Sequence, residues 1–206
     1  MRLVDAHCHL EAEEFSAKLG SVIADAEAAG IVKLVTASTR PEQWAASQAI
    51  AHRFHAVEFA MGLHPWYIQP GDIDRLQGLH EARDRGAVAI GEIGLDGKIE
   101  TPALSEQLPL FAFQLEVACS LDLPVIIHCR GAFGDLIRLF KEVGTPQAGG
   151  IVHAFSGSTQ IADELIDLGL DCSLGGTLTY RNSKKRDTVL RRVYPEHLLL
   201  ETDSPD

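Results

Sequence analysis

The sequence lacks an apolar run long enough to cross a bilayer, and it does not begin with a basic stretch followed by an apolar segment. Both absences argue against a membrane span and a secretory signal, so we expect a cytoplasmic protein with no membrane partner. The four cysteines form no Cys-x-x-Cys pair; they are Cys8, Cys119, Cys129 and Cys172. In a cytosolic chain such cysteines are expected to be reduced packing residues rather than disulfide bridges.

Basic residues are scarce, since 18 Lys and Arg stand against 29 Asp and Glu and the formal net charge is -11. Phosphate binding by proteins is driven by Lys and Arg, so a broad nucleic-acid-binding surface is not expected. A local pocket in which metal ions hold a phosphate is compatible with this charge. The composition is otherwise ordinary, and 206 residues predict one domain over residues 1–206. Nothing in the sequence indicates an obligate protein partner.

Short apolar, β-branched runs alternate with helical patterns along the whole chain. The candidate strands are residues 3–4 leading into His7, then 31–37, 57–61, 87–90, 123–127, 150–152, 170–174 and 198–200. Helical patterns cover 17–29, 41–50, 102–121, 133–140 and 161–168. Strands that alternate with helices predict a parallel sheet, and eight such units predict an α/β fold of the (β/α)₈ TIM-barrel type.

Two further observations bear on this fold. No glycine-rich dinucleotide loop follows the first strand, which argues against the competing doubly wound open sheet. The sequence ends just after the eighth apolar run. We therefore expect a barrel without the last helix: either the chain is shortened, or the barrel lacks an outer cover at that place, which would expose apolar surface.

Residues able to bind metal recur where the predicted strands end. The motif Val4-Asp-Ala-His-Cys-His9 places two imidazoles two positions apart, so they share a face of the first strand, and Asp5 shares that face with them. The other strand ends carry Glu92, His128, His153 and Asp203. Active sites of these barrels lie at the carboxyl ends of the strands. Four imidazoles and two carboxylates at one mouth are sufficient for two metals that share a carboxylate.

The same motifs resemble the TatD family of metal-dependent deoxyribonucleases, which belongs to the amidohydrolase-like barrels. The resemblance rests on DAHCH at 5–9, GLHP at 62–65, GEIGLD at 91–96, PVIIHCR at 124–130, HAFSGS at 153–158 and LLLETDSP at 198–205. It covers essentially the whole chain, with the motifs in order. It implies that His7, His9, Glu92 and Asp203 hold a first metal. It also implies that Glu92 bridges to a second metal, which His128 and His153 complete.

This resemblance implies a hydrolase that cleaves phosphodiester bonds of DNA. Two divalent ions would neutralise the phosphate charge, and a water bridging them would lose a proton far more easily than bulk water. We expect Glu92 and Asp203 to be the catalytic carboxylates, with Asp203 both binding metal and accepting the proton of the water. The imidazole-rich shell favours Zn or Mn over Ca, whereas the family is also described as using Mg.

Four residues near the predicted mouth are candidate substrate contacts: His64, Arg130, Arg181 and Lys184. His64 follows the third strand and Arg130 lies two residues after His128. An arginine there suits a phosphate oxygen, although a salt bridge to Glu201 or another rim carboxylate is the competing interpretation. Glu201 and Asp96 are expected to orient ligands or an arginine.

Three functions remain open from the sequence. A deoxyribonuclease is the first. The same site could hydrolyse another ester or an amide, because related barrels use it widely. A non-catalytic metal-binding module is the third, should the shortened end perturb Asp203.

The basic segment after the seventh strand gives a direct test of DNA contact. Residues 180–192 contain six of the 18 Lys and Arg residues. Replacing Lys184 and Lys185 with glutamine is expected to weaken binding of single-stranded DNA and to flatten its salt dependence. Binding through fewer phosphate contacts releases fewer counterions from the DNA. Fluorescence anisotropy at several salt concentrations measures this. An unchanged salt slope would mean that the segment is a solvated helix face.

Overall fold

The eight predicted strands form one parallel sheet that curves into a nearly closed barrel. The structure, a computed structural model, describes residues 1–179 and 184–205. Each strand pairs with the next in chain order. The strands are β1 (Leu3–Cys8), β2 (Ile31–Ala37), β3 (Val57–Met61), β4 (Ala89–Asp96), β5 (Val125–Arg130), β6 (Gly150–Val152), β7 (Leu170–Leu174) and β8 (Leu198–Leu200). The predicted barrel is thereby confirmed.

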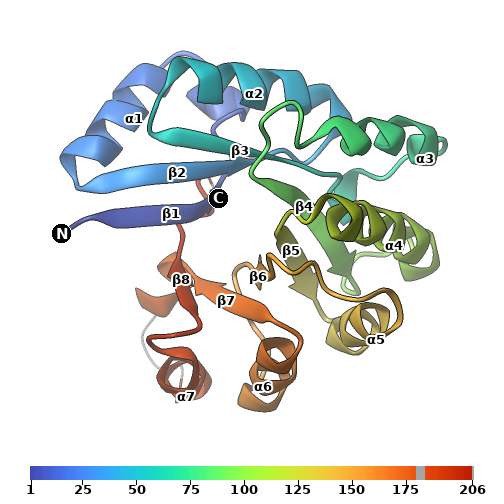
Figure 1. Cartoon of the computed structure of the whole chain (residues 1–206). Coiled ribbons are helices and arrows are strands. Elements are labelled where there is room, and N and C mark those ends of the chain that lie inside the picture. The colour runs from blue at the N-terminus through green and yellow to red at the C-terminus, as the bar shows by residue number, and fades with distance from the viewer. Residues whose placement is uncertain (180–183, 206) are drawn as a thin grey trace.

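The helices surround the strands on the outside (Figure 1). They are α1 (Leu19–Ala28), α2 (Trp44–Arg53), α3 (Asp72–Arg75), α4 (Leu104–Leu121), α5 (Phe133–Val143), α6 (Thr159–Asp167) and α7 (Lys184–Val193). Alternation along each strand divides the core. Val125 and Ile127 of β5 belong to the large cluster formed with the helices, whereas Ile126 between them packs with a cluster of strand residues alone.

Strands β4 and β5 extend further toward their carboxyl ends than the sequence predicted. The pairing of β4 with β5 continues from Ile93, opposite Ile127, to Asp96, opposite Arg130. The glycines of the GEIGLD motif lower the strand signal there. They are nevertheless needed, because a Cβ on Gly94 would lie 1.9 Å from the carbonyl oxygen of His128. Glu92 and His128 therefore lie within strands rather than just after them.

The connection between β3 and β4 is built from short helices that the sequence did not predict. The 3₁₀ helix η3 (Pro65–Tyr67) follows β3, and α3 and the 3₁₀ helix η4 (Leu76–Glu81) follow it. Leu76 and Leu79 of η4 are fully buried and cover the barrel at this place. Elements this short show too little periodicity to be recognised from sequence.

Helix α4 holds the carboxyl ends of two strands through buried glutamines. The side chain of Gln114 accepts a hydrogen bond from the Leu63 nitrogen (2.8 Å) and donates to the Leu63 oxygen (3.2 Å). The side chain of Gln107 likewise accepts a hydrogen bond from the Asp96 nitrogen (2.8 Å) and donates to the Asp96 oxygen (3.0 Å). The backbone groups concerned would otherwise be buried without partners, which is costly. These two glutamines therefore fix the segments that carry His64 and Asp96.

The barrel closes between β8 and β1 through the segment after β8, which runs beside β1 (Figure 1). The Asp203 nitrogen donates to the His7 oxygen (3.0 Å), and the His9 nitrogen donates to the Ser204 oxygen (2.8 Å). The carboxylate of Asp5, which is 4% exposed, accepts hydrogen bonds from the Thr202 nitrogen and hydroxyl at 3.0 and 2.7 Å. Asp5 thus joins the first strand to the segment that carries Asp203.

The outer side of this seam carries exposed apolar residues. Val4 of β1 and Leu200 of β8 are 46% and 44% exposed, and the described residues after β8 contain no helix to cover them. All four cysteines are free thiols, as expected. Among the helices of the described chain, none combines the length and apolar character that a bilayer crossing requires.

Candidate metal centre

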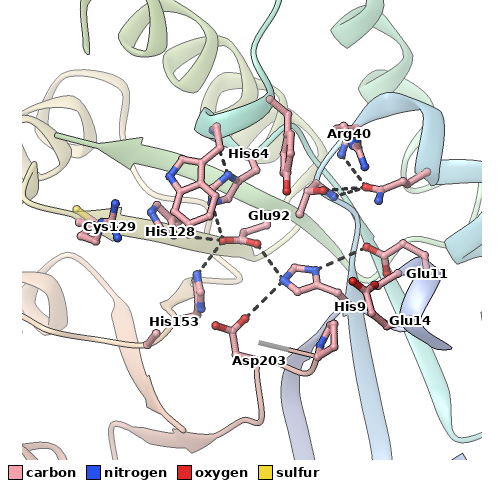
Figure 2. A pocket seen from close by; sticks show the side chains of 18 of the residues that line it. His9, Glu11, Glu14, Arg40, His64, Glu92, His128, Cys129, His153 and Asp203 are labelled. Atoms are coloured by element: carbon pink, nitrogen blue, oxygen red, sulfur yellow. Dashed lines mark hydrogen bonds and ion pairs between the residues drawn. The ribbon is translucent and has the colours of Figure 1, made fainter. Parts of the chain in front are cut away.

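Glu92 lies at the centre of a cluster of imidazoles at the carboxyl end of the barrel (Figure 2). Its two carboxylate oxygens face different groups. Oε2 lies 3.5 Å from His7 Nε2 and 3.4 Å from His9 Nε2. Oε1 lies 2.8 Å from His153 Nε2 and 3.5 Å from His128 Nδ1. One buried carboxylate therefore faces two separate sets of nitrogen donors.

Asp203 completes the set on the Oε2 side. Its Oδ1 lies 3.2 Å from His7 Nε2 and 3.5 Å from His9 Nε2. Three groups of donor atoms are close enough together to hold a cation: His7 with His153 and Asp203; His7 with His9 and Glu92; and His64 with Glu92 and His128. All six residues that the sequence singled out as metal ligands thus meet at one place.

The charges within the cluster follow from burial and from its mixture of acids and imidazoles. Burial would raise the pKa of Glu92, but the imidazoles of His64, His153 and His7 hold it well below its usual range, so this carboxylate is ionised. Burial together with the nearby His153 lowers the pKa of His7 to about 4. His7 is therefore a neutral imidazole at neutral pH, the form that binds metal.

His9 and His153 show the opposite shift. Burial alone would lower both pKa values, yet the neighbouring carboxylates Asp203, Glu11 and Glu92 raise that of His9 to about 11. Glu92 is the main cause that raises the pKa of His153 to about 9. The cluster of acids thus favours positive charge at this buried place.

A metal fits the donors present. Both ring nitrogens of His7 and of His153 are buried and lack an aligned hydrogen-bond partner among the described residues, although Nε2 of each ring faces a carboxylate oxygen. Buried nitrogens are normally satisfied, so four unsatisfied ones beside a carboxylate indicate a missing partner. Neutral imidazole nitrogens and carboxylate oxygens are the donors that Zn and related divalent ions prefer. His, Glu and Asp groups are therefore placed here to bind metal.

Hydrogen bonds at the far ring nitrogens determine which nitrogens are free to bind a cation. His9 Nδ1 lies 2.8 Å from the Ala37 oxygen, which can only accept, so Nδ1 carries a proton and Nε2 faces the carboxylates. His128 Nε2 lies 3.1 Å from Asp96, which leaves Nδ1 free on the side of Glu92. These contacts have the form of the carboxylate and carbonyl partners that orient metal-bound histidines.

His64 differs from the other histidines in this respect. Its Nδ1 accepts a hydrogen bond from the Trp66 nitrogen (3.1 Å), so in the neutral ring the proton is on Nε2. This Nε2 lies 3.2 Å from Glu92 Oε1. His64 is therefore arranged as a hydrogen-bond donor, although its position also places it within one of the possible metal groups.

Asp96 is a buried acceptor shared by three side chains of the site. It accepts hydrogen bonds from Trp66 Nε1 at 2.7 Å and from Arg130 Nε at 3.3 Å, in addition to its contact with His128. Burial would raise the pKa of Asp96, but the bonds from Trp66, the Lys98 nitrogen and His128 lower it to about 2. The orienting role predicted for Asp96 has its geometric basis in these contacts.

Glu201 makes different contacts from those considered in the sequence analysis. Its carboxylate accepts hydrogen bonds from the Ala154 nitrogen (2.7 Å) and from the Ser173 hydroxyl. Arg130 does form the competing salt bridge, but with the rim carboxylate of Asp96, at 3.1 Å, rather than with Glu201. Glu201 therefore supports the segment next to His153.

The metal centre forms the floor of a pocket of about 480 Å³. Its wall includes Trp66 and Arg130, whose side chains are about half exposed. Of the remaining predicted substrate contacts, Arg181 lies outside the described residues, and for Lys184 only the backbone at the start of α7 is described.

Two functional carboxylates escaped the sequence analysis. Glu11 lines the pocket, accepts a hydrogen bond from the Thr36 hydroxyl (2.5 Å) and lies 3.6 Å from His9 Nδ1. Asp5 joins β1 to the segment after β8, although it was expected only to share a face with His7. The period-two pattern through Asp5, His7, His9 and Glu11 was the available signal.

Comparisons with known proteins agree with this geometry. The family profile described as TatD related DNase matches residues 4–206. An uncharacterized metal-dependent hydrolase of Escherichia coli K12, YjjV, is 36% identical over all of this chain and 80% of its own length. The crystal structure of YjjV, a TatD homolog, superposes with a TM-score of 0.92 at 38% identity, covering 100% of this chain and 80% of that chain.

A zebrafish protein with a provisional deoxyribonuclease name, tatdn3, is 31% identical over 98% of this chain and 79% of its own length. A hydrolase of the TatD family from Entamoeba histolytica shares the fold, with a TM-score of 0.85 at 24% identity, covering 98% of this chain and 74% of that chain. The chain belongs to the TatD family of metal-dependent hydrolases.

Proposed function

We propose that this protein is a deoxyribonuclease of the TatD type that hydrolyses phosphodiester bonds with two divalent metal ions. The observation that carries the proposal is the position of Glu92, whose two carboxylate oxygens face two different sets of donors. The first ion would be held by His7, His9, Asp203 and Glu92, and the second by Glu92, His128 and His153. Zn, Mn and Mg are the candidate metals.

Ions bound there would neutralise the phosphate and make an attacking water more acidic. The side chains of the protein perform the remaining tasks. The neighbouring imidazoles of His7 and His9 keep the pKa of Asp203 well below its usual range despite its partial burial, so its carboxylate is ionised. Asp203 lines the pocket and is 30% exposed, which suits it to accept the proton of the water.

The substrate would be bound by groups on the opposite wall. His64 presents an N–H at Nε2 toward the centre, which can donate to a phosphate oxygen. Arg130 is held through Nε by Asp96, and its remaining guanidinium N–H groups suit phosphate. The half-exposed indole of Trp66 offers a face on which a base can stack. Arg181 and Lys184 remain proposed DNA contacts.

Removal of the metal tests this function. Purified protein should contain divalent metal by mass spectrometry and should cleave single-stranded DNA. A chelator should abolish cleavage, and adding back Zn, Mn or Mg should restore it, because the buried acids and imidazoles cannot bind the phosphate unaided. Protein that holds metal but cleaves only another ester or an amide would refute the nuclease proposal. Protein that binds no metal would indicate a non-catalytic role.

A further inference from the structure

Two arginines lie at the pocket on different sides of the metal centre. Arg40 and Arg130 are the only Lys or Arg residues among the described residues that line it. In Figure 2, Arg40 and Cys129, the residue before Arg130, lie on opposite sides of Glu92. Arg130 is already a proposed substrate contact, whereas Arg40 has no role in the function described above.

Each of these arginines is supported by an aromatic ring of the same short helix. The guanidinium carbon of Arg40 lies 4.6 Å from the centre of the Tyr67 ring. That of Arg130 lies 5.4 Å from the centre of the Trp66 ring. A guanidinium over an aromatic face is attracted to it and loses freedom of movement. Neighbouring residues of η3 thus position one positive charge on each side of the site.

The backbone that carries Arg40 is also fixed. The Gln43 side-chain oxygen accepts hydrogen bonds from the backbone nitrogens of Thr39 (2.9 Å) and Arg40 (3.1 Å). The His64 nitrogen donates to the Thr39 oxygen at 2.9 Å. The loop after β2 is therefore tied directly to a residue of the metal centre. The backbone of Arg40 therefore has a defined position relative to the site before any ligand binds.

The charge of Arg40 is not neutralised by an ion pair within the described part of the chain. Glu42, two residues further on, has its pKa lowered in part by Arg40 but forms its ion pair with Arg75. No carboxylate of the described residues lies within ion-pair distance of the Arg40 guanidinium. In a chain of net charge -11, an unpaired guanidinium beside a metal centre indicates an anionic ligand. Glu13 and Glu14 line the same pocket and would repel that anion from their side.

We propose that Arg40, supported by Tyr67, binds a phosphate next to the one being cleaved, on the side of the site away from Arg130. The ligand class is a single-stranded oligonucleotide with charged phosphates on both sides of the scissile bond. This inference rests on the proposed nuclease function and specifies its substrate. A neutral ester or a single phosphate group would leave Arg40 without a partner.

Binding of a fluorescein-labelled single-stranded phosphorothioate oligonucleotide, which keeps its charge and resists cleavage, tests the proposal. Anisotropy is measured with metal-loaded protein between about 50 and 200 mM salt. Arg40→Gln is expected to weaken binding about five- to tenfold at the low salt. It should also reduce the slope of log affinity against log salt by about 0.7, the value for one contact to a single strand. An unchanged slope would overturn the proposal.

Arg53 provides a matched control. It is an exposed arginine whose guanidinium lies 4.9 Å from the centre of the Phe54 ring, at the end of α2 and outside the pocket. Arg53→Gln removes the same charge from the same kind of support and should leave both affinity and slope at their wild-type values. A loss equal to that of Arg40→Gln would mean that only net charge matters, which also overturns the proposal.

Neutral methylphosphonate linkages, introduced one at a time, locate the phosphate. At the linkage that Arg40 contacts, neutralisation should weaken wild-type binding but not that of Arg40→Gln. If the affinity loss from Arg40→Gln and the loss from neutralising a linkage add at every linkage, Arg40 contacts none of these phosphates. If wild-type protein cleaves no phosphodiester but these binding results hold, the nuclease function fails and the Arg40 site stands. If it cleaves DNA and the slope is unchanged, only the Arg40 site fails.

Discussion

Glu92→Gln is expected to lose at least about a hundredfold in hydrolytic rate while the barrel stays folded. Mutating a residue that only hydrogen-bonds to a metal ligand already lowers metal affinity or activity by about 10- to 100-fold. This substitution removes the carboxylate that itself faces both donor sets. The amide keeps the shape of the side chain but loses its negative charge. Metal content by mass spectrometry should fall together with activity, whereas the far-ultraviolet circular dichroism should match the wild type.

The control for this experiment is Glu164→Gln on the surface of α6. Glu164 is an exposed carboxylate whose only close basic partner among the described residues is Lys141, at 3.5 Å. Its replacement should leave metal content and turnover unchanged. Near wild-type turnover in Glu92→Gln would contradict the shared-carboxylate site, even if metal were still bound.

Asp5→Ala is expected to lower the free energy of unfolding by about 2–3 kcal/mol. Burial raises the pKa of Asp5, and the Thr202 hydroxyl and nitrogen oppose that rise by donating to the carboxylate. Without these bonds the segment after β8 loses its side-chain connection to β1, and Asp203 is held less firmly. Urea denaturation measures the stability, and turnover under saturating metal should fall as well.

Thr202→Val separates the two bonds that Asp5 accepts from Thr202. The valine loses the hydroxyl donor but keeps the backbone nitrogen, so its destabilisation should be only about 1 kcal/mol. Equal destabilisation by Asp5→Ala and Thr202→Val would show that the backbone bond contributes nothing. If neither variant were destabilised, the closure between β8 and β1 would not depend on Asp5.

The barrel could be predicted because its signals are local. Residues 31–37 and 57–61 form β2 and β3 with the predicted bounds, since each is a short apolar run between turn residues. The ends of β4 and β5 were misjudged for a different reason. Whether a strand continues through Gly94 depends on pairing with a segment about thirty residues away, and no local pattern encodes that pairing.

The candidate site was partly predictable for the same reason. In parallel barrels the strand ends converge, so metal-type residues at strand ends could be grouped without coordinates. The partners of these residues could not be grouped in this way. The acceptor of His9 is a carbonyl of β2, and the support of Arg40 is a ring from the next loop. Such contacts depend on side-chain directions that only the assembled barrel defines.

The glutamines of α4 have a consequence for the rim of the barrel. The pairing of β3 with β4 covers Ala60 with Ala89 and Met61 with Ile90. Peptide groups beyond the end of such a pairing need other hydrogen-bond partners. Here the side chains of Gln114 and Gln107 supply them for Leu63 and Asp96. A helix outside the barrel thereby continues the backbone bonding past the point where the sheet stops, so the rim at these two residues does not depend on further strand pairing.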